Sequence, residues 1–217
     1  MVADTIIYHP TLTKLVKFWD STPKREKSFR LLAYLSRFLS FKNHFSFIRK
    51  GMRFFKPIPH LQTAAKAYDN QLMDPVLQVT TIIRNLGYAG YLGIDSVVFA
   101  KMLGLIDSKK WPNLSTYASR FWLLGLVAGI IHSLRIITSL SNYKRDPTDE
   151  KSAAAVDEKS ISKQLYQAKR KLVWDLLDSF IALNTLNYLH FTEGDIGLAG
   201  VITSIFGLED MWKATTV

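Results

Sequence analysis

The chain of 217 residues contains no cysteine. This absence excludes disulfide bonds, thiol nucleophiles and cysteine-based zinc sites. The first residues, MVADTIIYHPTLTK, also lack the basic stretch and apolar core of a secretory signal. A membrane protein with such a start is expected to insert from the cytosol.

Motifs for catalysis are missing as well. The five histidines are isolated, and the sequence has no nucleophile elbow, phosphate-binding loop or dinucleotide fingerprint. Gly87, Gly90 and Gly93 are close together, but no predicted strand precedes them as a phosphate loop requires. His190 and Glu193 have the spacing of a metal-binding pair, but no second acidic helix completes the site. We therefore expect no enzyme, no cofactor and no metal.

The alternation of apolar and polar residues that is typical of strands is also absent, whereas helical periodicity runs through most of the chain. The fold class expected is all-α: a membrane-associated helical protein with an N-terminal amphipathic region and one or two membrane segments in its C-terminal half. We divide the chain into a basic amphipathic region (1–70), apolar helices (71–141), a charged linker (142–163), and a C-terminal helix with a glycine-rich membrane segment (164–217).

Positive charge is abundant and unevenly distributed. The formal net charge is +10, and residues 1–60 hold twelve Lys or Arg against three acids, which accounts for +9 of it. Such an excess indicates an anionic partner, either a nucleic acid or an anionic membrane. The rest of the chain is close to neutral and more apolar.

The segment 41–60, FKNHFSFIRKGMRFFKPIPH, combines charge with aromatic residues and has no acid. At 100° per residue its side chains separate into an apolar and a basic side. We expect a break near 40–43 before this helix and an end at Pro57. The predicted membrane-inserting face consists of Phe41, Phe45, Phe47, Ile48, Met52, Phe54 and Phe55. The predicted lipid-headgroup ligands are Lys42, Arg49, Lys50, Arg53 and Lys56.

A helix with a basic face and a bulky apolar face suits a membrane surface better than a nucleic acid, because no nucleic-acid recognition motif accompanies it. Each Lys or Arg near an anionic surface contributes about 1 kcal/mol, and a buried Phe about 1.5–3 kcal/mol. The alternative is that these Phe pack against helix 23–39 in a soluble core.

Two longer helices are expected in the middle of the chain. Asp74 and the following proline predict a helix start, but Asp95 and Lys101 interrupt the apolar run 86–106, so we expect a buried or interfacial helix there. The run 121–140 is the most apolar and is the possible membrane segment.

Small residues are expected to pack helices closely in the C-terminal half. The predicted helix-packing residues are Gly125, Gly129, Gly194, Gly197, Gly200 and Ser204. We also expect Ser160 to cap the helix that follows the linker, and Asp175 and Asp178 to lie on its ordinary polar face.

Four stretches, in order along nearly the whole chain, resemble the peroxin-eleven family of peroxisomal membrane-proliferation proteins, of the fungal type. They are DTIIYHPTLTKLVKFWDSTPKREKSFRLLAYLSRFL, IRKGMRFFKPIPHLQTAAKA, RNLGYAGYLGIDSVVF and the series Gly194, Gly197, Gly200, Ser204. In the second stretch, the positions of Arg49, Gly51, Leu61 and Ala64 are similar to the family's amphipathic helix.

This resemblance implies a peroxisomal membrane protein with its N-terminal region facing the cytosol. It implies elongation and tubulation of the peroxisome membrane by amphipathic-helix insertion, and hence peroxisome fission and proliferation. The partners implied are an anionic phospholipid membrane, further copies of the chain, and a dynamin-related fission GTPase with its tail-anchored adaptor; no nucleic acid is expected.

The family also suggests an alternative function, a pore-forming channel for small metabolites. The candidate intramembrane residues for it would be Asp95, Lys101, His132 and Arg135, which helix contacts or snorkelling would equally explain.

Overall fold

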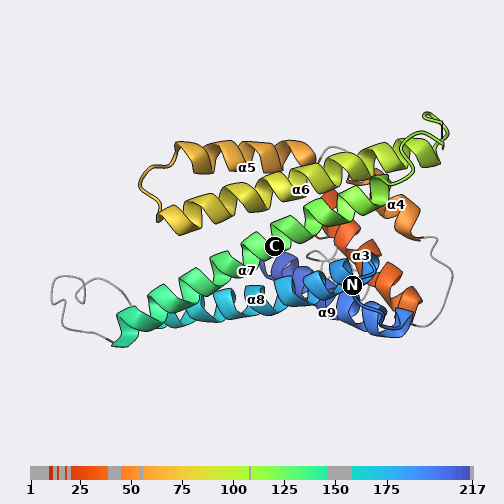
Figure 1. The fold of residues 1–217 in the computed structure, drawn as a ribbon. Coiled ribbons are helices and arrows are strands. Elements are labelled where there is room, and N and C mark those ends of the chain that lie inside the picture. Colours follow the sequence, from red (N-terminus) through yellow and green to blue (C-terminus); the bar gives the residue numbers. More distant parts are fainter. Residues whose placement is uncertain are drawn as a thin grey trace, which may run out of the picture.

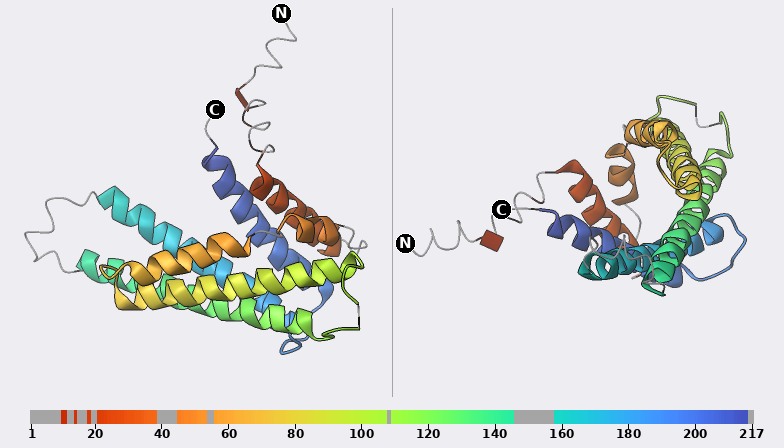
Figure 2. Two further views of the ribbon diagram at one scale, coloured as in Figure 1. Left: turned by 90° about the horizontal axis from the view of Figure 1, so that it is seen from above. Right: turned by 90° about the vertical axis from the view of Figure 1, so that its left-hand side faces the viewer.

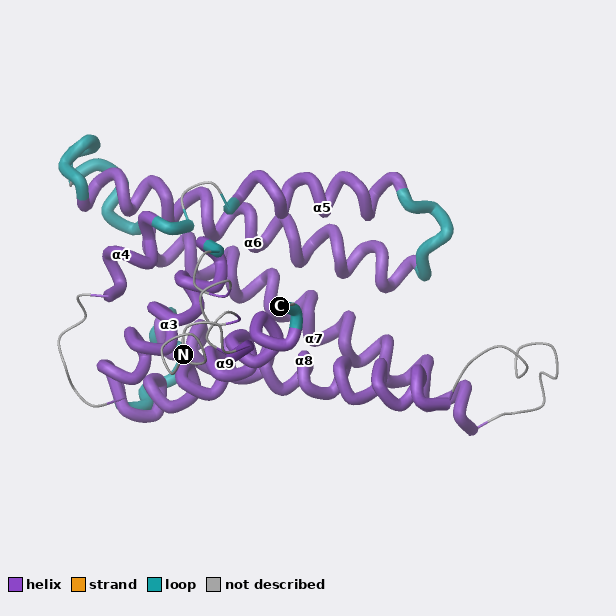
Figure 3. Tube along the Cα trace, turned by 180° about the vertical axis from the view of Figure 1, so that it is seen from behind, coloured by secondary structure: helices purple, strands orange, loops and turns teal. Residues whose placement is uncertain are grey.

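The described residues of the computed structural model, 10, 11, 14, 18, 21–38, 45–53, 56–107, 109–145 and 158–215, form helices and connecting turns without any strand (Figures 1 and 3). The predicted all-α class is therefore confirmed. The labelled helices are α3 (Thr22–Phe38), α4 (Phe45–Gly51), α5 (Pro57–Asp69), α6 (Pro75–Met102), α7 (Leu114–Arg145), α8 (Glu158–Thr185) and α9 (Glu193–Lys213).

Four consecutive helices, α5 to α8, run antiparallel to one another (Figure 1). Helix α6 packs on α5 and α7, and α7 packs on α8. Helices α3 and α9 pack on each other at one side of this array (Figure 2). Because α9 also contacts α8, and α4 contacts both α3 and α6, the packing contacts form a closed ring.

The helix starts follow local capping rules. Asp74 accepts hydrogen bonds from the backbone N–H groups of Val76 and Leu77 at the start of α6, as predicted. Thr192 and Asp195 form a capping box at the start of α9. Pro57, predicted to end one helix, is itself the first residue of α5, where a missing N–H carries no penalty.

Two predicted boundaries are wrong. The basic helix does not continue to Lys56, because α4 ends at Gly51 and a turn follows; residues 39–44, where the preceding break was expected, lie outside the described residues. Ser160 is not a cap, because α8 already begins at Glu158. Helices α7 and α8 also extend into both ends of the segment expected as a linker, 142–163.

Helices α6 and α7 cross at glycines. A Cβ atom added to Gly87 would lie 2.7 Å from the backbone nitrogen of Gly125 and 2.8 Å from the carbonyl oxygen of Phe121. These distances are far below van der Waals contact, so the two backbones touch only because neither glycine has a side chain.

The interior holds many polar side chains, and the exterior many large apolar ones. Several of the fully buried side chains are polar, among them Asp175, Ser133, Thr203 and Ser204. Apolar residues three or four positions apart are exposed along α6 and α7: Val76, Val79, Ile83 and Leu86 on the first, and Phe121, Leu124, Val127, Ile131 and Leu134 on the second. Both sets have helical spacing and form continuous outward stripes, which we call the outer apolar surface.

Within the described residues, one helix is long and apolar enough to cross a membrane: the stretch Leu114–Asn142 of α7. It contains the segment 121–140 expected from the sequence. The glycine-rich helix α9 does not meet the same measure.

Candidate functional site

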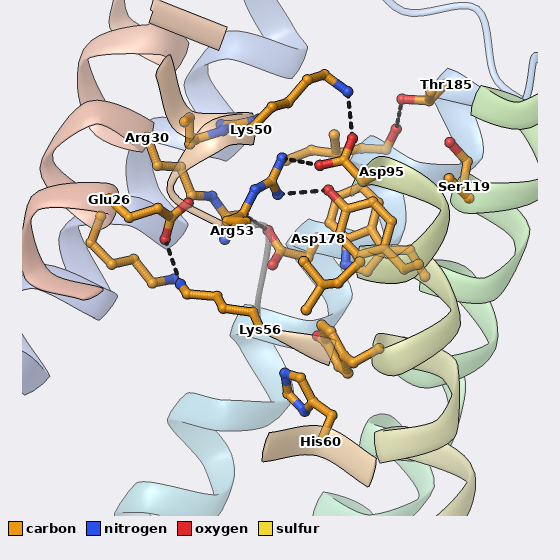
Figure 4. Close-up of a pocket in the computed structure, with 18 of the residues that line it drawn as sticks. Glu26, Arg30, Lys50, Arg53, Lys56, His60, Asp95, Ser119, Asp178 and Thr185 are labelled. Carbon is orange, nitrogen blue, oxygen red and sulfur yellow. Dashed lines mark hydrogen bonds and ion pairs between the residues drawn. The ribbon is translucent and has the colours of Figure 1, made fainter. Parts of the chain in front are cut away.

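A cavity of about 510 Å³ lies inside the ring of helices, lined by side chains from α3 to α8 (Figure 4). Its lining contains eight Lys or Arg side chains and three carboxylates. The carboxylates are Glu26, Asp95 and Asp178. Six of the cations form ion pairs, namely Arg30, Lys50, Arg53, Lys56, Arg84 and Lys171.

Asp95 receives two cations from the segment 41–60, which we call the basic segment. Lys50 Nζ and Arg53 Nη2 each donate to one of its carboxylate oxygens, the latter over 2.7 Å. Arg53 Nη1 also donates to the Tyr91 hydroxyl, 2.9 Å away. Figure 4 shows both side chains converging on Asp95. The charge that interrupts the apolar run of α6 is thus the anchor of the basic segment.

Glu26 and Asp178 hold the other side of the cavity. Lys56 Nζ lies 3.2 Å from Glu26 Oε2, and Arg30 Nη2 lies 2.6 Å from Asp178 Oδ1. Burial alone would raise the pKa of Glu26, but the positive charges of Lys56 and Arg53 outweigh it and hold that pKa below its ordinary value. Glu26 therefore remains ionised although its side chain is buried.

Asp175 is fully buried, which corrects the expectation that it and Asp178 lie on an ordinary polar face. Arg84 of α6 reaches it across α7 with two hydrogen bonds of 2.9 and 3.1 Å, and Lys171 donates a third. Gly129 of α7 leaves room for this pair, since a Cβ there would collide with the guanidinium of Arg84 and the carboxylate of Asp175.

Lys27 and Arg49 also line the cavity, yet neither bonds to a carboxylate among the described residues. Lys27 Nζ lies over the Trp174 ring, 4.7 Å from the ring centroid. The Arg49 guanidinium lies over the Tyr34 ring, 5.7 Å from the ring centroid. Burial and the neighbouring Arg30 lower the pKa of Lys27 to about 7, despite the opposing effect of Glu26.

The predicted headgroup ligands thus occupy three kinds of position. Lys50, Arg53 and Lys56 are held in ion pairs inside the protein, and Arg49 lines the cavity without an acidic partner among the described residues. Lys42 lies outside the described residues. In this conformation most of the basic segment faces the protein interior.

The predicted inserting face is described only in part. Ile48 is 44% exposed, and Met52 is half-buried. The remaining members, Phe41, Phe45, Phe47, Phe54 and Phe55, have side chains outside the described part of the chain. Membrane insertion of this face stays a prediction.

The predicted packing residues lie mostly at helix contacts within the chain. Gly125 faces α6, and Gly200 accommodates the ring of Tyr34 from α3. Ser204 is fully buried and donates to the carbonyl of Gly200, and Gly197 is buried too. A Cβ on Gly194 would meet only Thr192, at an ordinary distance.

The four channel candidates are not brought together. Asp95 lines the cavity, whereas His132, on a second pocket, lies 3.0 Å from the Thr80 hydroxyl. Lys101 donates to the carbonyl of Lys110, and Arg135 pairs with Asp74 over 2.7 Å. Neither of these two pockets is lined by Lys101 or Arg135.

An outer apolar surface, ionised side chains that point inward and one helix long enough to cross a membrane are features of α-helical membrane proteins. The family model described as peroxisomal biogenesis factor 11 (PEX11) matches residues 12–212, and the chain belongs to this family. The family expected from the four sequence stretches is therefore confirmed.

The similar proteins match over almost their whole length. "Peroxisomal membrane protein PMP27" of Saccharomyces cerevisiae is 40% identical, over 99% of this chain and 100% of its own. "Peroxisomal membrane protein PMP30B" of Candida boidinii is 37% identical, over 99% of both chains. "Peroxisomal biogenesis factor 11" of Schizosaccharomyces pombe is 21% identical, over 95% and 97%. No solved structure matches this chain.

Proposed function

We propose that this chain is a peroxisomal membrane protein that elongates and tubulates the membrane, and that its basic segment provides the contact with anionic lipid. The outer apolar surface is the observation that carries the membrane part of this proposal. Burying one exposed Leu, Ile or Val in lipid contributes about 1.5–3 kcal/mol, and two neighbouring helices present such residues in continuous stripes.

The basic segment would act by exchanging its partners. Lys50, Arg53 and Lys56 now pair with carboxylates of α3 and α6, and lipid phosphates offer the same cations an equivalent charge-assisted contact. Ile48, already exposed, would enter the apolar boundary of the same leaflet. A helix placed shallowly in one leaflet expands that leaflet alone and so favours curvature.

Family membership alone supports the remaining parts of the proposal. These are the promotion of peroxisome fission and proliferation, the cytosolic orientation of the N-terminal region, self-association, and engagement of a dynamin-related fission GTPase and its tail-anchored adaptor.

An exchange of charges between positions 26 and 56 tests the role of the basic segment. The double variant Glu26→Lys/Lys56→Glu keeps both the ion pair and the net charge but places a negative charge in the segment. Because each cation near an anionic surface contributes about 1 kcal/mol, we expect affinity for anionic liposomes to fall about five- to thirtyfold. Co-sedimentation and electron microscopy of tubules would measure this.

The reciprocal variant Asp95→Asn removes the partner of Lys50 and Arg53 and should strengthen binding to anionic liposomes. Binding to zwitterionic liposomes is the control, because neither set of substitutions should change it. Tubulation of anionic liposomes by the exchange variant at the wild-type level, with an unchanged melting temperature, would contradict the proposed role of the segment.

A further inference from the structure

The cavity carries more positive charge than its own carboxylates neutralise. Its eight cations face three lining acids, and Asp175, which pairs with Arg84 and Lys171, adds a fourth. An excess of cations thus remains around this partly enclosed space. Uncompensated charge in such a place is costly, and a bound anion would relieve that cost.

Several hydrogen-bond donors on cationic side chains that line the cavity lack an acceptor among the described residues. The Nε atoms of Arg49 and Arg53 are buried and without a partner in the described part of the chain. Arg53 is only 8% exposed. Lys27 lies over an aromatic ring and forms no ion pair with a carboxylate among the described residues. Buried donors of this kind are rare unless a ligand or water satisfies them.

The cavity is also larger than a simple ion requires. Its 510 Å³ falls within the usual range of small-molecule sites, about 300–1,000 Å³. Aromatic rings form part of the wall: Tyr91 stacks on Trp122 at 5.5 Å between centroids, and Tyr88 stacks on His60 at 5.4 Å. These rings offer flat apolar contacts beside the cations.

We propose that this cavity binds a phosphate-bearing small molecule, with its phosphate held by Lys27, Arg49 and Arg53 and its body against the aromatic wall. Guanidinium and ammonium groups together bind phosphate through charge-assisted hydrogen bonds. The phosphate belongs either to a soluble phosphate ester or to the headgroup of a phosphorylated lipid. The site lies within the folded chain and does not depend on membrane remodelling.

Calorimetric titration of the full chain in an uncharged detergent tests this proposal. The probes are ATP, a soluble phosphate ester, and inositol 1,4,5-trisphosphate, a lipid headgroup without its chains; sodium sulfate at equal ionic strength is the control. Saturable binding of one molecule per chain is expected for at least one probe. Preference for ATP would assign the soluble source, and preference for the inositol phosphate the lipid source. Binding of neither probe beyond sulfate would overturn the proposal.

A pair of matched variants locates the site. Lys27→Gln/Arg49→Gln removes two basic groups that form no ion pair among the described residues, and affinity should fall about tenfold or more. Lys163→Gln/Lys169→Gln removes two charges from exposed positions of α8 and should leave the affinity unchanged. An equal loss of affinity in both variants would show that diffuse charge attraction causes the binding, and would overturn the proposed site.

The melting temperature of the wild-type chain tests the proposal even if the double variant does not fold. A ligand that binds the native state raises the melting temperature with concentration. The bound probe should therefore raise the melting temperature of the wild-type chain, and sulfate at equal ionic strength should not. Equal shifts with probe and sulfate would count against the proposal.

Discussion

Lys27 is a single residue whose environment sets a pH dependence. Its ammonium group faces Arg30 and Lys56, which repel it, and Glu26 and Asp178, which attract it; burial dominates and lowers its pKa from 10.5 to about 7. Below pH 7 the folded chain bears the whole cost of burying this charge. Between pH 7 and 10.5 the unfolded state binds a proton that the folded state does not, so this group's contribution to stability rises with pH.

The variant Lys27→Met should therefore stabilise the chain most at low pH. It keeps the apolar stem beside Trp174 and removes the charge, and the gain should be on the order of 2 kcal/mol near pH 6.5. The gain should shrink as the pH approaches 10. Thermal unfolding in detergent at several pH values measures it, with the exposed Lys169→Met as control. A gain that is the same at pH 6.5 and 9.5 would contradict the lowered pKa.

The buried carboxylates are residues that periodicity placed incorrectly. Asp175 and Asp178 do share one face of α8, as the sequence predicts, but that face points into the protein. Helical periodicity shows which residues lie together and not whether their face meets water. Charges inside apolar runs, such as Arg84 and Asp95, were the available signal, because in membrane proteins such residues turn inward.

At the scale of the element, the contact between α6 and α7 depends on glycine at one position and not at another. Gly87 touches the backbone of α7, whereas a Cβ on Gly93 of the same helix would meet nothing within 4 Å. Gly87 thus lies at a close backbone contact, whereas Gly93 of the same helix has space for a side chain.

Replacing each of these glycines by alanine should shift stability in opposite directions. Gly87→Ala should destabilise the chain by about 1–3 kcal/mol, because the methyl group forces the helices apart. Gly93→Ala should stabilise it by up to about 1 kcal/mol through better helix propensity. Melting temperatures in detergent compare the two. A stabilising Gly87→Ala would mean that the two helices do not cross at this point.

Helix α4 shows why the basic segment was predicted too long. Its 100° pattern continues to Lys56, but the chain turns after Gly51, where Arg53 reaches Asp95. Contacts with a helix more than forty residues away decide this boundary, and such contacts do not appear in local periodicity. The start at Asp74 was predicted correctly because its cap bonds are local.

At the scale of the whole molecule, the outer apolar surface predicts a lipid-facing exterior. The chain has no cysteine, so a single introduced thiol reports one position without interference. In reconstituted liposomes, Leu124→Cys and Ile131→Cys should react at least about tenfold more slowly with a water-soluble maleimide than Ser162→Cys, because lipid covers α7.

Denaturation in detergent is the control. All three thiols should then react equally fast, which shows that each is intact. Labelling of Leu124→Cys and Ile131→Cys in liposomes as fast as that of Ser162→Cys would show that the outer apolar surface meets water. Periodicity predicts the helical class and composition the membrane association. The inward assembly of cations from α3, α4, α6 and α8, and from the residues between α4 and α5, required the tertiary structure.

The closed ring of packing contacts has a topological consequence. A ring contains one contact more than its members need to stay joined, so one member can leave while the rest remain connected. Helix α4 is the shortest labelled helix, and Lys50 of this helix and Arg53 just after it pair with Asp95 of α6. The loss of α4 from the ring therefore leaves the remaining helices packed in series, and α4 belongs to the segment that would reach for lipid.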